Sequence, residues 1–116
     1  QALRTLDAES AKLVQRLKSC TARVCYTDET AYKLVNILSK AGRRVPEDIS
    51  IVGIDNSGVA KFCSVPLTSV ENPAEELGRT AAESIVGKIL RNENMETQEF
   101  MPKLVMRSSV QVIHEI

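Results

Sequence analysis

Residues 45–56 read VPEDISIVGIDN and join a polar turn, a strand and an acidic strand end. The nearly continuous β-branched run from Ile49 to Ile54 is typical of a strand that is covered on both faces of a parallel sheet. Pro46 fixes the turn that enters this strand, and Gly53 allows another backbone or a ligand to approach it closely. Asp55 then places a carboxylate just beyond the carboxyl end of the strand, where open α/β sheets bind their ligands. The stretch therefore predicts a parallel α/β fold and a ligand-binding residue.

The residues before this stretch continue the α/β pattern. A short strand is predicted at 22–26, and a helix follows from Asp28 to about residue 41, with Gly42 at the position of a left-handed cap. The connection between the two strands is long enough to force parallel pairing. Parallel neighbours deliver their carboxyl ends to one edge of the sheet, so Asp28 and Asp55 are expected to face one crevice. A capping role at the start of the helix is the alternative explanation for Asp28.

The remaining segments complete a single expected domain. A longer helix is predicted at 72–90, with Asn72 as its cap and Pro73 at its first helical position. Its apolar residues recur at intervals of four, which predicts one apolar face. The other predicted elements are an amphipathic helix at 7–18, a loop or short irregular helix at 57–66, a brief strand at 67–70 and a strand-like segment at 100–107.

Composition and charge argue against several classes of protein. The formal net charge is +0 and the 15 basic residues are scattered along the sequence, so the sequence shows no basic cluster of the kind that binds nucleic acid. Cys20, Cys25 and Cys63 are odd in number and lack the spacing of a zinc site, which favours free thiols in a reducing cytoplasm. No apolar run approaches the roughly eighteen residues of a membrane span, and the first residues do not form a signal peptide.

No catalytic or metal-binding set is visible in the sequence. His114 is solitary, and no Ser or Cys is arranged around it as a nucleophile. We therefore expect neither an enzyme nor a bound cofactor. The pair Asp28 and Asp55 points to binding instead, because carboxylates accept several hydrogen bonds at once and suit a neutral ligand with many hydroxyl groups. A sugar is the natural candidate.

Four motifs carry a resemblance to a known family. They are TDETA at 27–31, the stretch at 45–56, PLTSV at 66–70 and LGRTAA at 77–82. In order and spacing they resemble the lactose-repressor and galactose-repressor family of bacterial transcription regulators. The resemblance implies a periplasmic-binding-protein-like effector domain of type I, with two α/β lobes and a sugar cleft between them. It also implies that this chain is the carboxyl-terminal part: 1–66 a second-lobe core, 67–92 a helix that crosses to the first lobe, and 93–116 a closing strand segment.

The resemblance also implies roles for single residues. Asp55 matches the family acid that hydrogen-bonds the effector, and Thr27 with Asp28 matches a cleft position where many members have Asn-Asp. Thr27 replaces the Asn of that pair, and Ala74 lies near a cleft position that is sometimes aromatic. The loop that resembles part of the family's dimer contact, together with the helix at 30–38, supplies the implied interface residues Phe62, Cys63, Ser64 and Leu34.

The function implied is that of a cytoplasmic, homodimeric, sugar-responsive repressor, which would bind DNA through an amino-terminal helix-turn-helix absent from this chain. Cys25-Tyr26 and residues 67–70 look most like the arabinose-repressor branch, which makes arabinose the candidate sugar. One alternative is a periplasmic sugar-binding protein of a transport system, which would carry a signal peptide in place of the helix-turn-helix. A phosphoryl-accepting receiver domain is a further alternative, but it would need a late Lys-Pro step where this chain has Pro102-Lys103.

Overall fold

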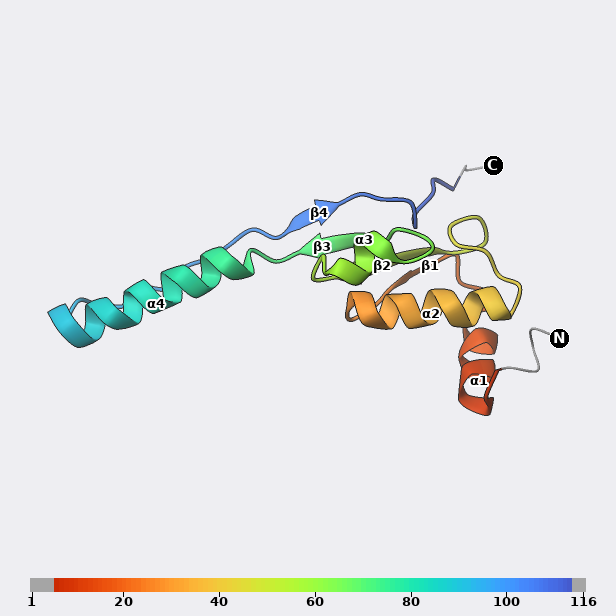
Figure 1. Cartoon of the computed structure of the whole chain (residues 1–116), viewed down its shortest axis with the longest axis horizontal. Helices are drawn as coiled ribbons and strands as arrows, with labels where there is room; N and C mark the ends of the chain where they lie inside the picture. Colours follow the sequence, from red (N-terminus) through yellow and green to blue (C-terminus); the bar gives the residue numbers. More distant parts are fainter. Residues whose placement is uncertain (1–5, 114–116) are drawn as a thin grey trace. The chain divides into compact units, whose positions relative to one another are not determined.

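The computed structural model describes residues 6–113, and these form two compact units. The first unit comprises residues 6–71 and 104–113, and the second comprises residues 72–103. The helices and strands, labelled in Figure 1, are α1 (Ala8–Arg16), β1 (Ala22–Val24), α2 (Asp28–Lys40), β2 (Ser50–Ile54), α3 (Gly58–Phe62), β3 (Thr68–Glu71), α4 (Ala74–Arg91) and β4 (Lys103–Val105). His114 lies outside the described residues.

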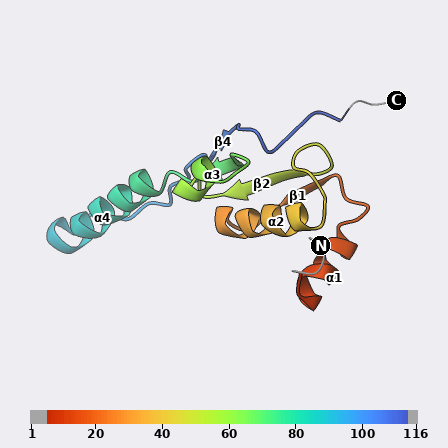
Figure 2. The ribbon, with the colours of Figure 1, turned by 45° about the vertical axis from the view of Figure 1, so that its right-hand side comes forward.

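The sheet has the strand order β1-β2-β3-β4. Strand β2 pairs in parallel with β1, where Ala22 is opposite Ser50, and in parallel with β3, where Val52 is opposite Thr68. Figure 2 shows β1 and β2 side by side, with α2 as the connection between them. The predicted parallel α/β fold is confirmed. The strands at 22–26 and 100–107 are shorter than predicted, since β1 and β4 have three residues each.

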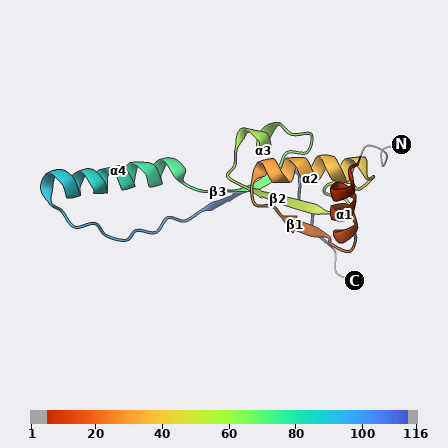
Figure 3. The ribbon, with the colours of Figure 1, turned by 90° about the horizontal axis from the view of Figure 1, so that it is seen from below.

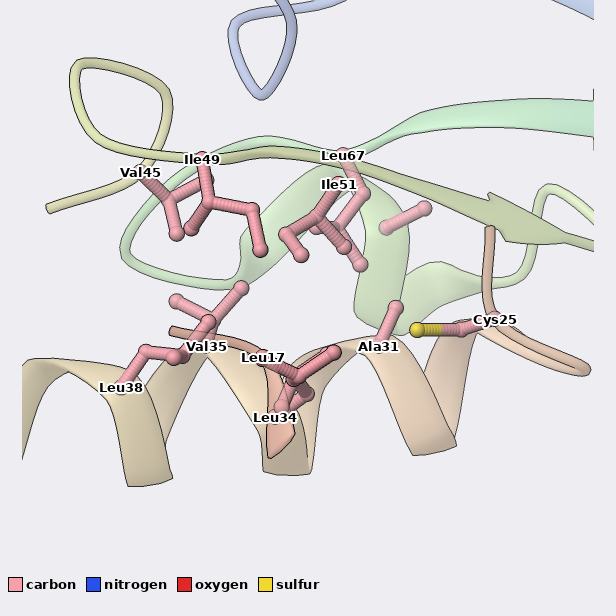
Figure 4. Close-up of a cluster of buried hydrophobic side chains, with 11 residues drawn as sticks. Leu17, Cys25, Ala31, Leu34, Val35, Leu38, Val45, Ile49, Ile51 and Leu67 are labelled. Carbon is pink, nitrogen blue, oxygen red and sulfur yellow. The ribbon is translucent and has the colours of Figure 1, made fainter. Parts of the chain in front are cut away.

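Helix α2 covers one face of this sheet and supplies much of the core. Its apolar residues recur with helical spacing, so they all reach the same side, and Figure 4 shows them pointing at the residues of β2 and its entry turn. The helix ends where Gly42 adopts a left-handed φ of 80°, as predicted. The buried core consists of Leu17, Cys25, Ala31, Leu34, Val35, Leu38, Val45, Ile49, Ile51, Ala60 and Leu67.

Helix α1 lies at the carboxyl end of α2 (Figures 1 and 3). Asp7 caps α1 by accepting a hydrogen bond of 2.7 Å from the Ser10 backbone N–H, and this bond lowers the pKa of Asp7. Arg43 fixes the junction, because its guanidinium donates to the carbonyl oxygens of Leu17 at 2.6 Å and Cys20 at 3.0 Å. It also donates to the carbonyl of Asp48 at 3.2 Å, so one side chain joins α1, the start of β1 and the turn before β2.

The segment after β4 holds β2 and β3 together through Ser109. The Ile51 N–H donates to the Ser109 carbonyl at 2.9 Å, and the Thr68 N–H donates to Ser109 Oγ at 2.9 Å. Ser109 Oγ in turn donates to the Ile51 carbonyl, and the residue is fully buried. A single serine therefore satisfies backbone groups of both strands next to the point where their parallel pairing begins.

The second unit consists of α4 and the segment that follows it. The predicted cap of this helix is wrong by one residue: the cap position is Pro73, which makes no side-chain capping bond, and the Ala74 N–H donates to the Asn72 carbonyl. The helix ends at Asn92, which is left-handed with φ of 53°. Its predicted apolar residues Leu77, Ile85 and Ile89 are exposed in this chain. Within residues 6–113, no helix has the length and apolar character needed to cross a membrane.

Gly53 in β2 lies directly against the first residue of α2. A Cβ atom at this position would lie 3.1 Å from Asp28 Cα and 3.2 Å from Asp28 Cγ, and still closer to Oδ1. The sequence predicts that Gly53 allows another backbone or a ligand to approach closely. In the structure, the group that approaches it is the first residue of α2.

We predict that Gly53→Ala lowers the free energy of unfolding by about 1–3 kcal/mol, because the added methyl group must push α2 away from β2. The measurement is urea denaturation followed by circular dichroism. Gly58→Ala is the matched control, since nothing lies within 4 Å of a Cβ at that position. The control is expected to be neutral or to stabilise by up to about 1 kcal/mol. Equal stability of the two variants would contradict the assignment of close packing to Gly53.

Candidate functional site

The chain leaves β2 through two residues in an uncommon backbone conformation. Asp55 has φ of 107° and Asn56 has φ of 52°. Positive φ is rare for residues other than glycine, although Asn and Asp adopt it more often than most, and it costs about 1–3 kcal/mol per residue. Such a conformation persists only where surrounding contacts impose it. The Asp55 side chain is exposed at the carboxyl edge of the sheet, as the sequence predicts.

The contacts that impose this conformation are hydrogen bonds to three successive backbone N–H groups. The Asp55 N–H donates to the Val70 carbonyl at 2.8 Å, the Asn56 N–H donates to Ser69 Oγ at 3.0 Å, and the Ser57 N–H donates to Asp28 Oδ2 at 2.7 Å. We call residues 55–57 the Asp55 loop. It is held by β3 and by the first residue of α2, so the position of the exposed carboxylate is defined by two neighbouring elements.

The carboxylate of Asp28 is buried and fully engaged with protein groups. The residue is 1% exposed, and beside the Ser57 N–H it accepts from Ser57 Oγ at 3.0 Å and from Ser69 Oγ at 2.6 Å. These donors are neutral, and the amino-terminal end of α2 adds a favourable partial positive charge. The expectation that Asp28 and Asp55 face one crevice needs correction, because only Asp55 is exposed. A direct contact between Asp28 and a ligand would require these bonds to break.

Thr27, the neighbour of Asp28, caps α2. Its Oγ1 accepts from the Thr30 N–H at 3.1 Å and lies 3.1 Å from Thr30 Oγ1. The capping role that the sequence offered for Asp28 therefore belongs to Thr27. A hydroxyl oxygen that accepts from a backbone amide still carries a proton to donate, so a contact between Thr27 and a ligand stays a prediction.

Two further side chains shape this edge of the sheet and were not found from the sequence. Asn56 donates through Nδ2 to Glu71 Oε1 at 3.0 Å and accepts through Oδ1 from Arg107 Nη2. Arg107 also donates through Nη1 to the Leu67 carbonyl at 2.8 Å, and its backbone N–H donates to Thr68 Oγ1 at 2.9 Å. The Asn after Asp55 was a usable signal, because Asn is common at positive φ. Arg107 carries no such signal in the sequence.

The residues predicted for a dimer contact divide between surface and core. Phe62 is 87% exposed, and together with Tyr32, Val59 and Cys63 it lines a shallow hollow that we call the Phe62 surface. Ser64 is also exposed. Leu34 is 4% exposed and belongs to the core, so it offers no surface to a second copy and that part of the prediction needs correction. Partial burial raises the pKa of the Cys63 thiol.

The described residues contain no alternative site with obvious chemistry. No group of three or more His, Cys, Asp or Glu side chains within residues 6–113 could hold a metal ion. Cys25 is buried in the core, where desolvation raises the pKa of its thiol. Asp48, at the opposite end of β2 from Asp55, forms an exposed ion pair with Arg44, and the hydrogen bond from Arg44 lowers the pKa of Asp48.

Comparison with known proteins gives a consistent set of relatives. Residues 2–110 match the model of a family described as the periplasmic binding protein-like domain. The chain is 40% identical over 91 residues to the HTH-type transcriptional repressor PurR of Photobacterium profundum, an alignment that covers 78% of this chain and 27% of that protein. It is 33% identical over 104 residues to the protein of the same name from Vibrio atlanticus, covering 89% and 31%. The chain thus spans less than a third of the length of these relatives.

Solved structures agree with these matches. A transcriptional regulator CelR–cellobiose complex superimposes with a TM-score of 0.78 at 32% identity, covering 88% of this chain and 32% of that one. A LacI family transcriptional regulator from Enterococcus faecium with bound ribose gives a TM-score of 0.76 at 28% identity, covering 87% and 39%. The chain therefore belongs to the periplasmic binding protein-like domain family, in the group that contains the LacI-family transcriptional regulators.

Proposed function

We propose that this chain is the carboxyl-terminal part of the effector-binding and dimerisation domain of a cytoplasmic, sugar-responsive repressor. The observation that carries the proposal is the exposed Asp55 carboxylate, held at the carboxyl edge of a parallel sheet by the bonded Asp55 loop. Open α/β sheets bind ligands at this edge. The backbone that carries Asp55 is already ordered and loses little freedom when the side chain binds a ligand, which favours a role in recognition.

The chemistry of the edge favours a neutral ligand with many hydroxyl groups. The Asp55 carboxylate accepts several hydrogen bonds, and the Thr27 hydroxyl can donate one. Related regulators of known structure are described in complex with cellobiose, with lactose and with ribose. Arabinose remains the candidate suggested by the sequence motifs, so a pentose and a disaccharide should both be tested.

The proposed mechanism involves binding without chemical conversion. A sugar that contacts Asp55 and the rest of the effector domain stabilises one of two arrangements of that domain, and the change is passed to an amino-terminal DNA-binding domain. Such a ligand shifts the equilibrium only by its difference in affinity for the two arrangements. Repression is then controlled by sugar concentration, and no catalytic residue is required.

We predict that Asp55→Asn weakens sugar binding roughly ten- to hundredfold, because hydrogen bonds to a charged acceptor are lost. The protein to use is the longer polypeptide that joins this chain to the rest of its effector domain, which we call the full-length regulator. The measurement is titration calorimetry with ribose, arabinose, lactose and cellobiose. Asp48→Asn is the matched control, since it removes an acid at the opposite end of β2 and should leave affinity unchanged.

Two results would contradict the proposal. The full-length regulator could bind none of these sugars, which would overturn sugar as the effector class. Alternatively, Asp55→Asn could bind the best of the four sugars as tightly as the wild type, which would overturn the site and leave the effector class standing.

We further propose that the Phe62 surface contributes to a homodimer of the full-length regulator. A large exposed aromatic side chain over a hollow lined by Tyr32, Val59 and Cys63 is typical of protein interfaces. Phe62→Asp is predicted to weaken self-association at least tenfold in sedimentation velocity, because a charge would have to be buried in the contact. Tyr26→Asp is the control, since Tyr26 is 84% exposed on the same unit but lies outside that surface. An equal effect of the two variants would argue against the Phe62 surface.

A further inference from the structure

We infer that Asp28 is a positioning residue for Asp55: its buried carboxylate fixes the Asp55 loop, and through the loop it sets the direction in which Asp55 meets the sugar. The inference rests on the proposed function of Asp55. It assigns to Asp28 a role that requires no contact with the ligand, in agreement with its 1% exposure.

The hydrogen-bond directions identify Asp28 as the acceptor on which the loop depends. The Ser57 N–H can only donate, so the group that faces it at 2.7 Å must accept. Ser69 Oγ has one proton, which it donates to Asp28 Oδ1 at 2.6 Å, and this leaves its lone pairs for the Asn56 N–H at 3.0 Å. Asp28 therefore holds Ser57 directly and Asn56 through Ser69. Two of the three backbone N–H groups of the loop depend on this carboxylate.

No other residue type fits this position equally well. An Asn at position 28 has only one accepting atom at its tip, so its amide group would face either Ser57 or Ser69. Facing the Ser57 N–H would set donor against donor, and facing Ser69 would leave the Ser69 proton without its acceptor. A Glu is too long, because the contact between Gly53 and Asp28 already leaves no room for a methyl group on β2. The site thus requires a short side chain with two accepting oxygen atoms.

The backbone conformation of the Asp55 loop explains why the hydrogen bonds to Asp28 are needed. Asp55 and Asn56 both have positive φ, and this strain is maintained only while the surrounding bonds hold. When the bonds to Asn56 and Ser57 weaken, the loop can relax toward negative φ. The carboxylate of Asp55 then leaves the direction in which it is now held, although its own chemistry is unchanged.

The first test measures the loop without any ligand. Asp28→Asn is nearly isosteric and is expected to raise the hydrogen-exchange rate of the peptide containing residues 54–58 about tenfold or more in the full-length regulator, since charge-assisted bonds are lost. Ser69→Ala keeps the bond between Asp28 and the Ser57 N–H, and removes the acceptor for the Asn56 N–H together with one donor to Asp28. It is expected to show a smaller increase. Asp48→Asn is the control and should leave this peptide unchanged. Unchanged exchange in both Asp28→Asn and Ser69→Ala would overturn the inference.

The second test separates positioning from a general loss of structure. In calorimetry with the best of the four sugars named above, Asp28→Asn should weaken binding about tenfold when Asp55 is present, and less than about twofold in an Asp55→Asn background. An equal loss in both backgrounds would show that Asp28 acts independently of Asp55 and would overturn the inference. If the wild-type protein binds none of the sugars, the proposed function fails, and the exchange experiment still decides whether Asp28 holds the loop.

Discussion

A buried carboxylate is stable only when it is surrounded by hydrogen-bond donors, and Asp28 obtains its donors from the two segments that meet at the carboxyl edge of the sheet. Ser57 lies just after β2 and Ser69 lies within β3, and both donate to the first residue of α2. The bonds therefore lock a helix and two strands at one point. Gly53 makes the arrangement possible, because its missing side chain leaves the space that Asp28 occupies.

Bonds between a side chain and the backbone also hold other parts of the sheet together. The strands of this sheet have only three to five residues, so the ladders between them contain few hydrogen bonds. Ser109 supplies bonds to both β2 and β3, and Arg43 joins the segments that precede β1 and β2. Within residues 6–113, every buried side-chain nitrogen and oxygen atom has a partner. The hydrogen-bonded polar groups therefore help to fix the positions of the elements around a small core, and no buried side-chain nitrogen or oxygen atom of the described residues is left unpaired.

Local patterns in the sequence predicted the parallel order of β1 and β2, the helix between them, the turn at Gly42 and the exposed acid at Asp55. Each of these depends on residues that are close in the sequence. The features that could not be predicted depend on distant partners. Thr27 and Asp28 are both suitable caps, and the choice between them is made by serines 29 and 41 residues after Asp28. Arg107 reaches Asn56 across 51 residues, and Leu34 faces inward because the sheet covers it.

Ser109 also has a consequence for the order in which the chain folds. Its bonds to Ile51 and Thr68 join residues that are 58 and 41 positions away in the sequence. The entropic cost of closing such long loops is met only when the last segment docks, and contacts of this range slow folding. During synthesis on a ribosome, β2 and β3 both emerge well before residue 109. The parallel pairing of β2 with β3 does not involve Ser109, but the backbone groups of Ile51 and Thr68 that Ser109 satisfies stay unbonded until it docks, and until then they are open to pairing with the wrong partner.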